Sequence, residues 1–169
     1  IGVPKESHPG EKRVALIPVS VERLVKKGAA VSVESGLGVS IHAGDEAYKK
    51  AGAQVTDRAT ALSSDIVLRL RKPALEEVSR LKKGAIHISF LDPFNESQLL
   101  EAFIKAGVSS ISMEMIPRTT IAQKMDALSS QANLAGYVSV VLAAERLTKI
   151  IPMMTTPAGT ITPARVFII

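Results

Sequence analysis

The chain has 169 residues, enough for about one domain, or for one domain and a piece of a second. Hydrophobic residues make up 46% and charged residues 22%, which is typical of a folded globular protein and argues against disorder. The chain has no cysteine, no tryptophan and only 4% aromatic residues, so disulfide frameworks, thiolate metal sites and cysteine nucleophiles are excluded, and a base-stacking platform is poorly supplied.

The 21 Lys and Arg residues exceed the 16 Asp and Glu residues, which gives a formal net charge of +5. These cations are spread along the chain, with lysines shortly before Gly28, Gly52, Gly84 and Gly107. A glycine often ends a helix, and cations favour the negative end of the helix dipole. We therefore interpret the lysines as solvated helix ends in preference to a patch for nucleic acid or lipid, and we expect no nucleic-acid partner.

No uninterrupted apolar run reaches the length of a bilayer span. The best candidate, residues 127–144, is broken by serine, glutamine and asparagine. No signal peptide is visible, and a chain that begins with Ile1 is consistent with a processed or trimmed start.

The N-terminal three quarters of the chain alternates β-rich runs with amphipathic helical segments. Asp45 and Asn95 are placed as helix caps, and Pro93 and Pro117 as strand stops. This alternation predicts an α/β fold, with an open, mostly parallel sheet flanked by helices, as in a Rossmann-like first subdomain. The predicted strands are residues 1–3, 30–34, 65–70, 85–91 and 108–113, and the predicted helices are residues 18–27, 45–52, 75–81 and 96–106.

The remainder of the chain has a different pattern. Residues 126–146 are predicted as one long helix, and no Lys or Arg occurs from Met125 to Ala144, so we expect this helix to be buried on most sides. Residues 153–161 are predicted as a loop or irregular hairpin, and residues 164–169 as a strand that begins a second Rossmann subdomain. The predicted domains are therefore 1–125, and 126–169 as a bridging helix and the first strand of an incomplete nucleotide-binding subdomain.

The strongest local feature is the polar spacing after Pro117. Gln123, Asp126 and Ser129 are three residues apart, and share one helix face if the helix begins early enough. An amide, a carboxylate and a hydroxyl are costly to bury without partners, and a polar planar ligand would supply them. Arg118 could pair with Asp126 or contact a carboxamide or phosphate of that ligand. The alternative is a helix N-terminus capped by Thr120 or Asp126.

Two further cations and the histidines are weaker candidates. Arg13 and Lys72 are placed where a small anion could bind, although each could equally be an ordinary surface cation. The three histidines lack metal-ligand spacing, so no metal site is expected.

Several of these segments together resemble the N-terminal domain of the alanine dehydrogenase/NAD(P) transhydrogenase family. The resemblance covers essentially the whole chain, and the block 117–137, with its Ala-Gln, Met-Asp-Ala-Leu-Ser-Ser-Gln and Asn-Leu-Ala-Gly-Tyr runs, is specific to the transhydrogenase branch. The other matching segments are residues 1–6, 11–16, 33–38, 48–53 and 153–160.

The resemblance implies an NAD(H)-binding component of a proton-translocating transhydrogenase, which transfers hydride between NADH and NADP⁺. It implies that Arg118, Gln123, Asp126 and Ser129 are the catalytic and cofactor-binding residues near the nicotinamide. It also implies a homodimer, an NADP(H)-binding partner domain and a membrane subunit. The expected location is peripheral, at the cytoplasmic face of a bacterial inner membrane or the mitochondrial matrix side.

Two departures from the family keep alternatives open. Alanine dehydrogenases carry a catalytic histidine where this chain has Asp92, although the residues matching their substrate Arg and Lys, Arg13 and Lys72, are present. The chain also stops before the Gly-rich dinucleotide fingerprint, so we expect this piece alone to be inactive. The alternatives are an alanine dehydrogenase-like amino-acid oxidoreductase and a non-catalytic dimerisation domain.

Overall fold

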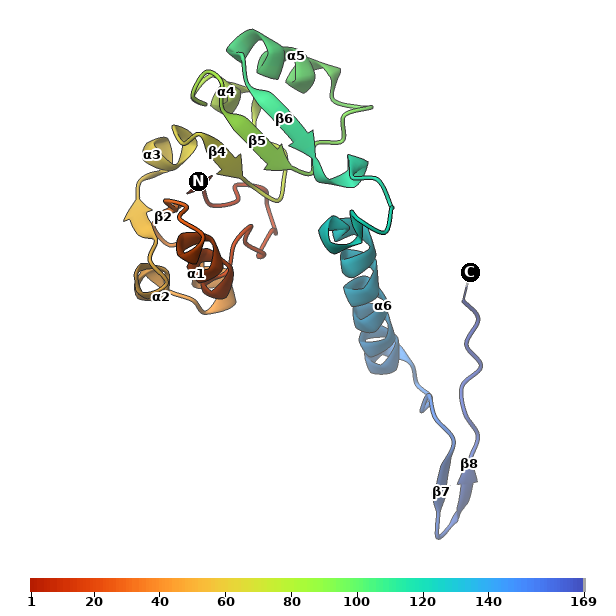
Figure 1. Cartoon of the computed structure of the whole chain (residues 1–169). Coiled ribbons are helices and arrows are strands. Elements are labelled where there is room, and N and C mark those ends of the chain that lie inside the picture. Colours follow the sequence, from red (N-terminus) through yellow and green to blue (C-terminus); the bar gives the residue numbers. More distant parts are fainter. Residues whose placement is uncertain (169) are drawn as a thin grey trace. The chain divides into compact units, whose positions relative to one another are not determined.

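In the computed structural model, which describes residues 1–168, the chain divides into two compact units, Ile1–Met125 and Asp126–Ile169. Each unit is described by itself, and Figure 1 shows the order of their elements.

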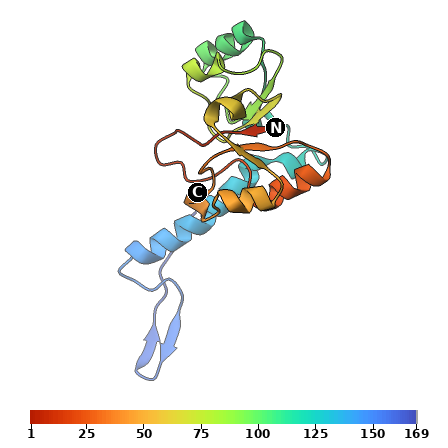
Figure 2. The same ribbon diagram turned by 90° about the vertical axis from the view of Figure 1, so that its left-hand side faces the viewer.

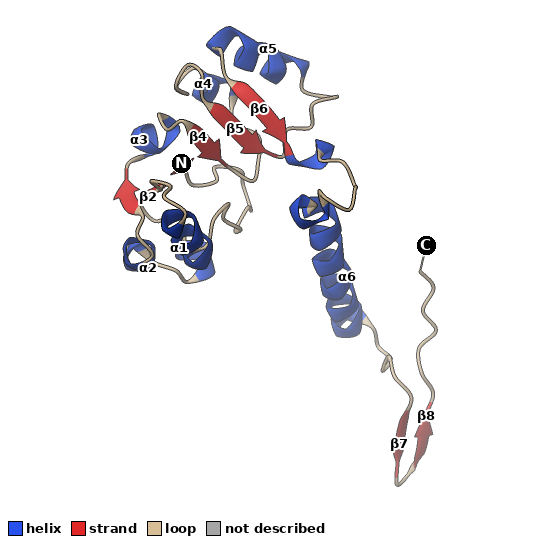
Figure 3. Cartoon of the chain, viewed as in Figure 1, coloured by secondary structure: helices blue, strands red, loops and turns tan. Residues whose placement is uncertain are grey.

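The first unit is built on one six-stranded sheet in which every pair of neighbouring strands is parallel. The strand order is β3-β2-β1-β4-β5-β6, with the first strand in the middle. This order is that of doubly wound nucleotide-binding folds, and it confirms the predicted open parallel sheet flanked by helices. Figure 3 shows β4, β5 and β6 side by side. The strands are β1 (Gly2–Val3), β2 (Ser32–Glu34), β3 (Gln54–Thr56), β4 (Ile66–Leu68), β5 (Ile86–Ser89) and β6 (Ser109–Ser112).

Two apolar clusters fix the helices to the sheet. One contains Val3 and Val33 of the sheet with Val21 and Tyr48 of the first two helices. The other contains Val67 of β4 with Leu62, Val78 and Phe103 of the later helices. Val67 is the register partner of Gly2, and neighbouring residues of a strand point to opposite faces, so the clusters of Val67 and of Val3 lie on opposite faces of the sheet. Figure 2 shows helices of the first unit on both sides of its strands. The helices are α1 (Pro18–Lys26), α2 (Asp45–Lys50), α3 (Arg58–Leu62), α4 (Leu75–Val78) and α5 (Ser97–Ala106).

Gly2 in β1 is required by a close approach of α3. A Cβ atom at this position would lie 1.8 Å from the carbonyl oxygen of Ala61 and 2.6 Å from Oγ of Ser64. The missing side chain therefore allows the helix to pack directly on the central strand.

The structure differs from the sequence-based prediction in several short elements. β3 and α3 were not predicted, and Asp57 caps α3 by accepting a hydrogen bond from the Thr60 N–H at 2.7 Å. Asn95 does not cap α5, because its side chain donates to the Asp92 carboxylate at 2.8 Å. Asp45 is the first residue of α2 instead of its cap, and its carboxylate accepts the Gly36 N–H and the Ser35 hydroxyl, both at 2.7 Å.

The second unit contains one long helix and a two-stranded hairpin. α6 (Ala127–Arg146) confirms the predicted helix, and the antiparallel strands β7 (Met154–Thr156) and β8 (Gly159–Ile161) form the expected hairpin. Residues 164–168 form no strand, and residue 169 lies outside the described residues. A strand needs a neighbouring strand to take its backbone hydrogen bonds. The Ala164 N–H donates to the Ile151 carbonyl oxygen at 3.2 Å, but residues 164–168 pair with no strand among residues 1–168.

The prediction that the long helix is buried is wrong for this structure. All residues of α6 are exposed, apart from the half-buried Ala127 and Gln131. A helix with few charged residues is buried only where another layer of the protein covers it. The hairpin of β7 and β8 in this unit is too small to cover α6. By length and composition alone, α6 is also the one helix among the described residues that could cross a membrane.

Candidate functional site

All six strands of the first unit are parallel, so the loops that follow them leave the same edge of the sheet. Open sheets of this kind bind ligands beyond the carboxyl ends of their strands, where the strand order reverses. In this chain the reversal lies at β1, between β2 and β4. The loops after β1 and β4 meet at this point.

Protein side chains already bridge the two loops at the reversal. The carboxylate of Glu6 accepts the backbone N–H groups of Leu70 at 2.6 Å and Arg71 at 3.3 Å. The two loops are therefore joined by a carboxylate of the chain itself.

A half-buried ion network continues from this bridge. Arg69, only 4% exposed, pairs with Glu77 at 2.6 Å and also donates to the Ser7 hydroxyl at 3.2 Å. Arg58 joins Glu77 at 2.6 Å to Glu34 at 2.8 Å. Burial raises the pKa of Glu77, but its hydrogen bonds and charge interactions with Arg69 and Arg58 outweigh that effect and hold the pKa below its usual value. These paired charges hold the fold together and leave no carboxylate of the network without a cation.

The two cations predicted to bind a small anion each have a carboxylate partner within the chain. Arg13 donates to both oxygens of Glu11, at 2.8 and 2.7 Å, and Arg71 donates to the same carboxylate at 2.9 Å. The hydrogen bond from Arg13 is the main cause that lowers the pKa of Glu11 to about 2. Lys72 pairs with Glu96. The geometry therefore assigns Arg13 and Lys72 to ion pairs.

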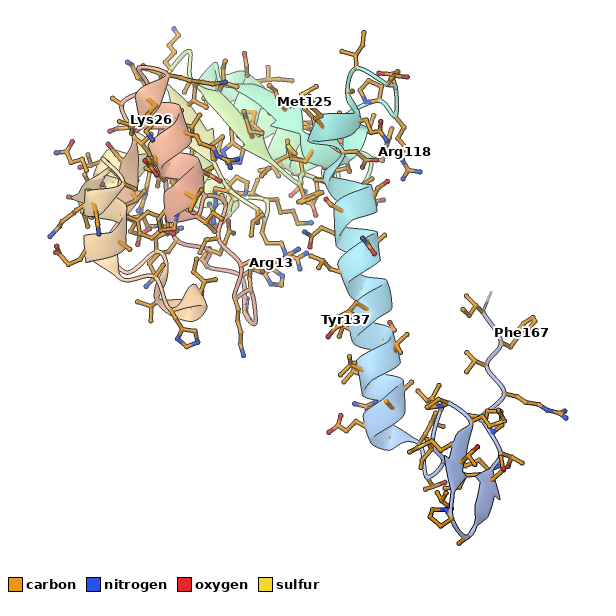
Figure 4. The ribbon with its side chains drawn as sticks, turned by 60° about the horizontal axis from the view of Figure 1, so that its bottom comes forward. Arg13, Lys26, Arg118, Met125, Tyr137 and Phe167 are labelled. Carbon is orange, nitrogen blue, oxygen red and sulfur yellow. The ribbon has the colours of Figure 1, made fainter. Side chains whose placement is uncertain are left out.

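Arg118 and Gln123 have no such partners. Arg118 lies in the loop before α6 and Gln123 begins the short helix η3 (Gln123–Met125), and both are exposed. Neither side chain forms a hydrogen bond or ion pair with any of residues 1–168, and Figure 4 shows the Arg118 side chain extending away from its loop. The segment is anchored by Ala122, which is 5% exposed. Among the predicted site residues, these two side chains are donors that a ligand could use without breaking an existing ion pair.

Asp126 and Ser129 form a helix cap. The Asp126 carboxylate accepts the Ser129 backbone N–H at 3.0 Å and the Ser129 hydroxyl at 2.6 Å. α6 begins at Ala127, so the early helix start that would place Gln123, Asp126 and Ser129 on one helix face is not found. Asp126 has an extended backbone and separates η3 from α6. The alternative in which Asp126 caps the helix describes this position correctly.

Sequence analysis did not single out the carboxylates that join the loops as site residues. Glu6 and Glu34 stand after β1 and at the end of β2, and Glu114, which accepts the N–H groups of Leu91 and Asp92, stands after β6. An acidic residue at this position, repeated for three strands, is the signal that could have identified them.

Comparisons with known proteins agree with the geometry. Residues 2–135 match the family model described as the alanine dehydrogenase/PNT N-terminal domain. The chain is 41% identical to NAD(P) transhydrogenase subunit alpha of Cereibacter sphaeroides, over 100% of this chain and 33% of that protein. The crystal structure of transhydrogenase from Sinorhizobium meliloti superposes with a TM-score of 0.90 at 43% identity, over 96% of this chain and 49% of that one.

Relatives of lower sequence identity are named alanine dehydrogenases. Alanine dehydrogenase of Bacillus subtilis is 31% identical over 88% of this chain and 39% of that protein. In each of these comparisons the chain spans less than half the length of its relative.

Proposed function

The chain belongs to the alanine dehydrogenase/PNT N-terminal domain family, and from this premise we propose that it is the N-terminal portion of the NAD(H)-binding component of a proton-translocating NAD(P) transhydrogenase. The observation that carries the proposal is the match to a transhydrogenase alpha subunit, at 41% identity over the whole chain. The match to alanine dehydrogenase is weaker and shorter, at 31% identity over 88% of the chain.

The free side chains fit the nicotinamide end of NAD(H). The Arg118 guanidinium group is permanently charged and has several N–H donors, so it is suited to bind a carboxamide oxygen or a phosphate. Gln123 offers both a donor and an acceptor, as a carboxamide requires. Asp126 and Ser129 fix the start of α6 and complete the proposed catalytic and cofactor-binding set.

A bound NADH supplies the hydride, and the residues of this chain orient it. Hydride transfer requires the donor and acceptor rings in a near-attack geometry and needs no proton shuttle on the protein. The four residues therefore act by holding the pyridine ring, with the acceptor NADP⁺ on a partner domain.

The proposed assembly follows from the same relatives. The name of the Cereibacter sphaeroides protein describes it as the alpha subunit of a transhydrogenase, which implies further subunits. We propose a homodimer that docks with an NADP(H)-binding domain and a membrane subunit, as a peripheral component at the cytoplasmic face of a bacterial inner membrane or the mitochondrial matrix side.

An alanine dehydrogenase-like activity is the second candidate, because Arg13 and Lys72 lie at the carboxyl edge of the sheet. Three observations weigh against it. Arg13 is held by Glu11, Lys72 pairs with Glu96, and Asp92 stands where that branch has its histidine.

One experiment separates the two candidates. The full-length protein is mixed with NADH and an NADP⁺ analogue in a stopped-flow instrument, and separately with NADH, pyruvate and ammonia. Hydride transfer to the NADP⁺ analogue without ammonia-dependent pyruvate reduction supports the proposal. The reverse pattern would establish the second candidate.

A further inference from the structure

We propose that Glu114 is a positioning residue that fixes the loop after β5, and the start of the segment leading to Arg118, at the carboxyl edge of the sheet. The fixing of the loop stands on contacts in the first unit alone, whereas the benefit to nucleotide binding rests on the proposed function.

Glu114 clamps a neighbouring loop through backbone hydrogen bonds. It lies in the short helix η2 (Met113–Met115), which follows β6 directly. Its Oε1 accepts the N–H of Leu91 at 3.0 Å and that of Asp92 at 2.5 Å, and its Oε2 lies 3.3 Å from the Leu91 nitrogen. One carboxylate thus holds two consecutive N–H groups more than twenty positions away in the sequence.

The backbone at the clamp presents two successive N–H groups to one anion, as an anion-binding nest does. Asp92 adopts a left-handed conformation with φ of 54°, which is uncommon for a residue other than glycine. A left-handed residue in a turn makes successive N–H groups converge on one point, and such concavities bind anions. In this chain the converging groups of Leu91 and Asp92 meet the Glu114 carboxylate.

The surroundings lower the pKa of the Glu114 carboxyl group and bury one of its two partners, Leu91. Burial raises the pKa of Glu114, but the Ser112 hydroxyl and the backbone N–H groups, including those of Asp92 and Leu91, outweigh it and lower the pKa overall. Leu91 is only 1% exposed. Water therefore replaces the carboxylate poorly at the Leu91 N–H, and loss of the carboxylate leaves a buried donor unsatisfied.

The clamp connects two regions of the candidate site. The loop it holds is braced internally by the N–H groups of Asn95 and Glu96, which donate to the Asp92 carbonyl oxygen at 3.0 and 3.1 Å. Glu96 in turn pairs with Lys72. On the other side, Glu114 precedes Arg118 by four residues, with the rigid Pro117 between them. A free cation is more effective for binding when its segment is held in place beforehand.

The test uses Glu114→Ala in the full-length protein, because the vacated nest should accept a small carboxylate. Without nucleotide, hydrogen exchange at the Leu91 and Asp92 amides should become about tenfold faster, as expected for the loss of charge-assisted hydrogen bonds. The Kd for NADH should rise about tenfold. Added formate should partly restore the slow amide exchange and the NADH affinity, whereas chloride at equal ionic strength should restore neither. The matched control is Glu101→Ala, an exposed α5 carboxylate that forms no ion pair among the described residues. It should leave both measurements unchanged.

Each outcome decides one element of the proposal. Unchanged amide exchange in Glu114→Ala would overturn the clamp. Faster exchange with unchanged NADH affinity, or no rescue by formate, would overturn the positioning role. A wild-type protein that binds no NADH, with exchange still faster in the variant, would contradict the proposed function and support the clamp. If Glu114→Ala does not fold, Glu114→Gln replaces it, because one acceptor oxygen remains, and a smaller change in the same direction is then expected.

Discussion

Two regions at the same edge of the sheet use their charges in opposite ways. Around the loops after β1 and β4, the arginines Arg13, Arg58, Arg69 and Arg71 all pair with carboxylates of the chain. After β6, the guanidinium group of Arg118 has no partner among residues 1–168. Paired arginines therefore mark structure at the first region, whereas an arginine without a carboxylate partner among residues 1–168 marks the candidate site at the second. Four variants or conditions test this difference, from the largest expected change in unfolding free energy to the smallest.

Arg69→Met tests the paired region. The variant takes from the half-buried Glu77 one of its two cationic partners and leaves Arg58 as the other, so the cost should be roughly 3 kcal/mol of unfolding free energy, at the low end for a broken buried pair. Urea denaturation of the chain measures this loss. Arg71→Met, which removes a more exposed pair with Glu11, is the control and should cost under about 1 kcal/mol. Similar losses in both variants would contradict the distinction between the buried and the exposed pairs.

The unfolding free energy should also depend on pH through His87, a fully buried residue of β5 whose ring lies against that of Phe103. Burial, with a smaller contribution from the charge of Arg69, lowers the pKa of His87 from 6.5 to about 4. Above pH 6.5 the histidine is neutral in both the folded and unfolded states. Between pH 6.5 and 4 only the unfolded state takes up the proton, so the unfolding free energy falls by about 3 kcal/mol in total, and His87 adds no further loss below pH 4.

The measurement is urea denaturation at a series of pH values, for the wild type and for His87→Gln. The variant should be less stable at pH 7 but should lose less stability between pH 6.5 and 4. Curves of equal slope would show that the proton taken up on unfolding belongs to another group.

Two variants of Asp126 distinguish its role as the cap of α6 from its proposed role in hydride transfer. Asp126→Ala removes the acceptor that caps α6 and should cost about 1 kcal/mol, visible as faster amide exchange in the first turn of the helix. Asp126→Asn keeps an acceptor oxygen and should lose less stability, yet it should slow hydride transfer in the full-length protein. Wild-type transfer rates in Asp126→Asn would remove Asp126 from the proposed site.

Arg118→Ala should have the smallest effect on stability, within about 0.5 kcal/mol, because the side chain contacts no partner among the described residues. In the full-length protein we expect NADH to bind about tenfold more weakly, since a hydrogen bond to a charged group is lost. Fluorescence titration measures the affinity. A large loss of stability with unchanged affinity would reverse the comparison of the two regions.

The fold was largely predictable because its signals are local. The apolar run Ile66-Val67-Leu68 predicts a buried strand by itself, and the alternation of strands and helices predicts a parallel sheet. β3 has only three residues, and Gln54 at its start is exposed, so it carries too little apolar pattern to be identified. The exposure of α6 could not be predicted, because composition reports a preference for burial and does not show what covers a helix.

The choice of site residues stays a prediction, and the geometry around them could not be predicted from the sequence. Gln123, Asp126 and Ser129 have helical spacing, yet that spacing holds only if the helix is continuous, and the capping geometry of Asp126 begins it at Ala127. The pairing of Arg13 with Glu11 could not be predicted, because it depends on a local backbone conformation that brings the Arg13 N–H and guanidinium group to the Glu11 carboxylate. The nest at Asp92 depends on a left-handed conformation, which the sequence alone does not specify.

The position of β1 in the centre of the sheet has a consequence for how the chain folds. The two residues of β1 pair with β2 on one side and with β4 on the other. During synthesis, both edges of β1 can therefore be covered only after residues 66–68 have left the ribosome. Pairing over such distances makes folding slow and leaves apolar strand edges open during synthesis. Early contact of Gly2 with α3, permitted by its missing side chain, would shield the nascent strand during that interval.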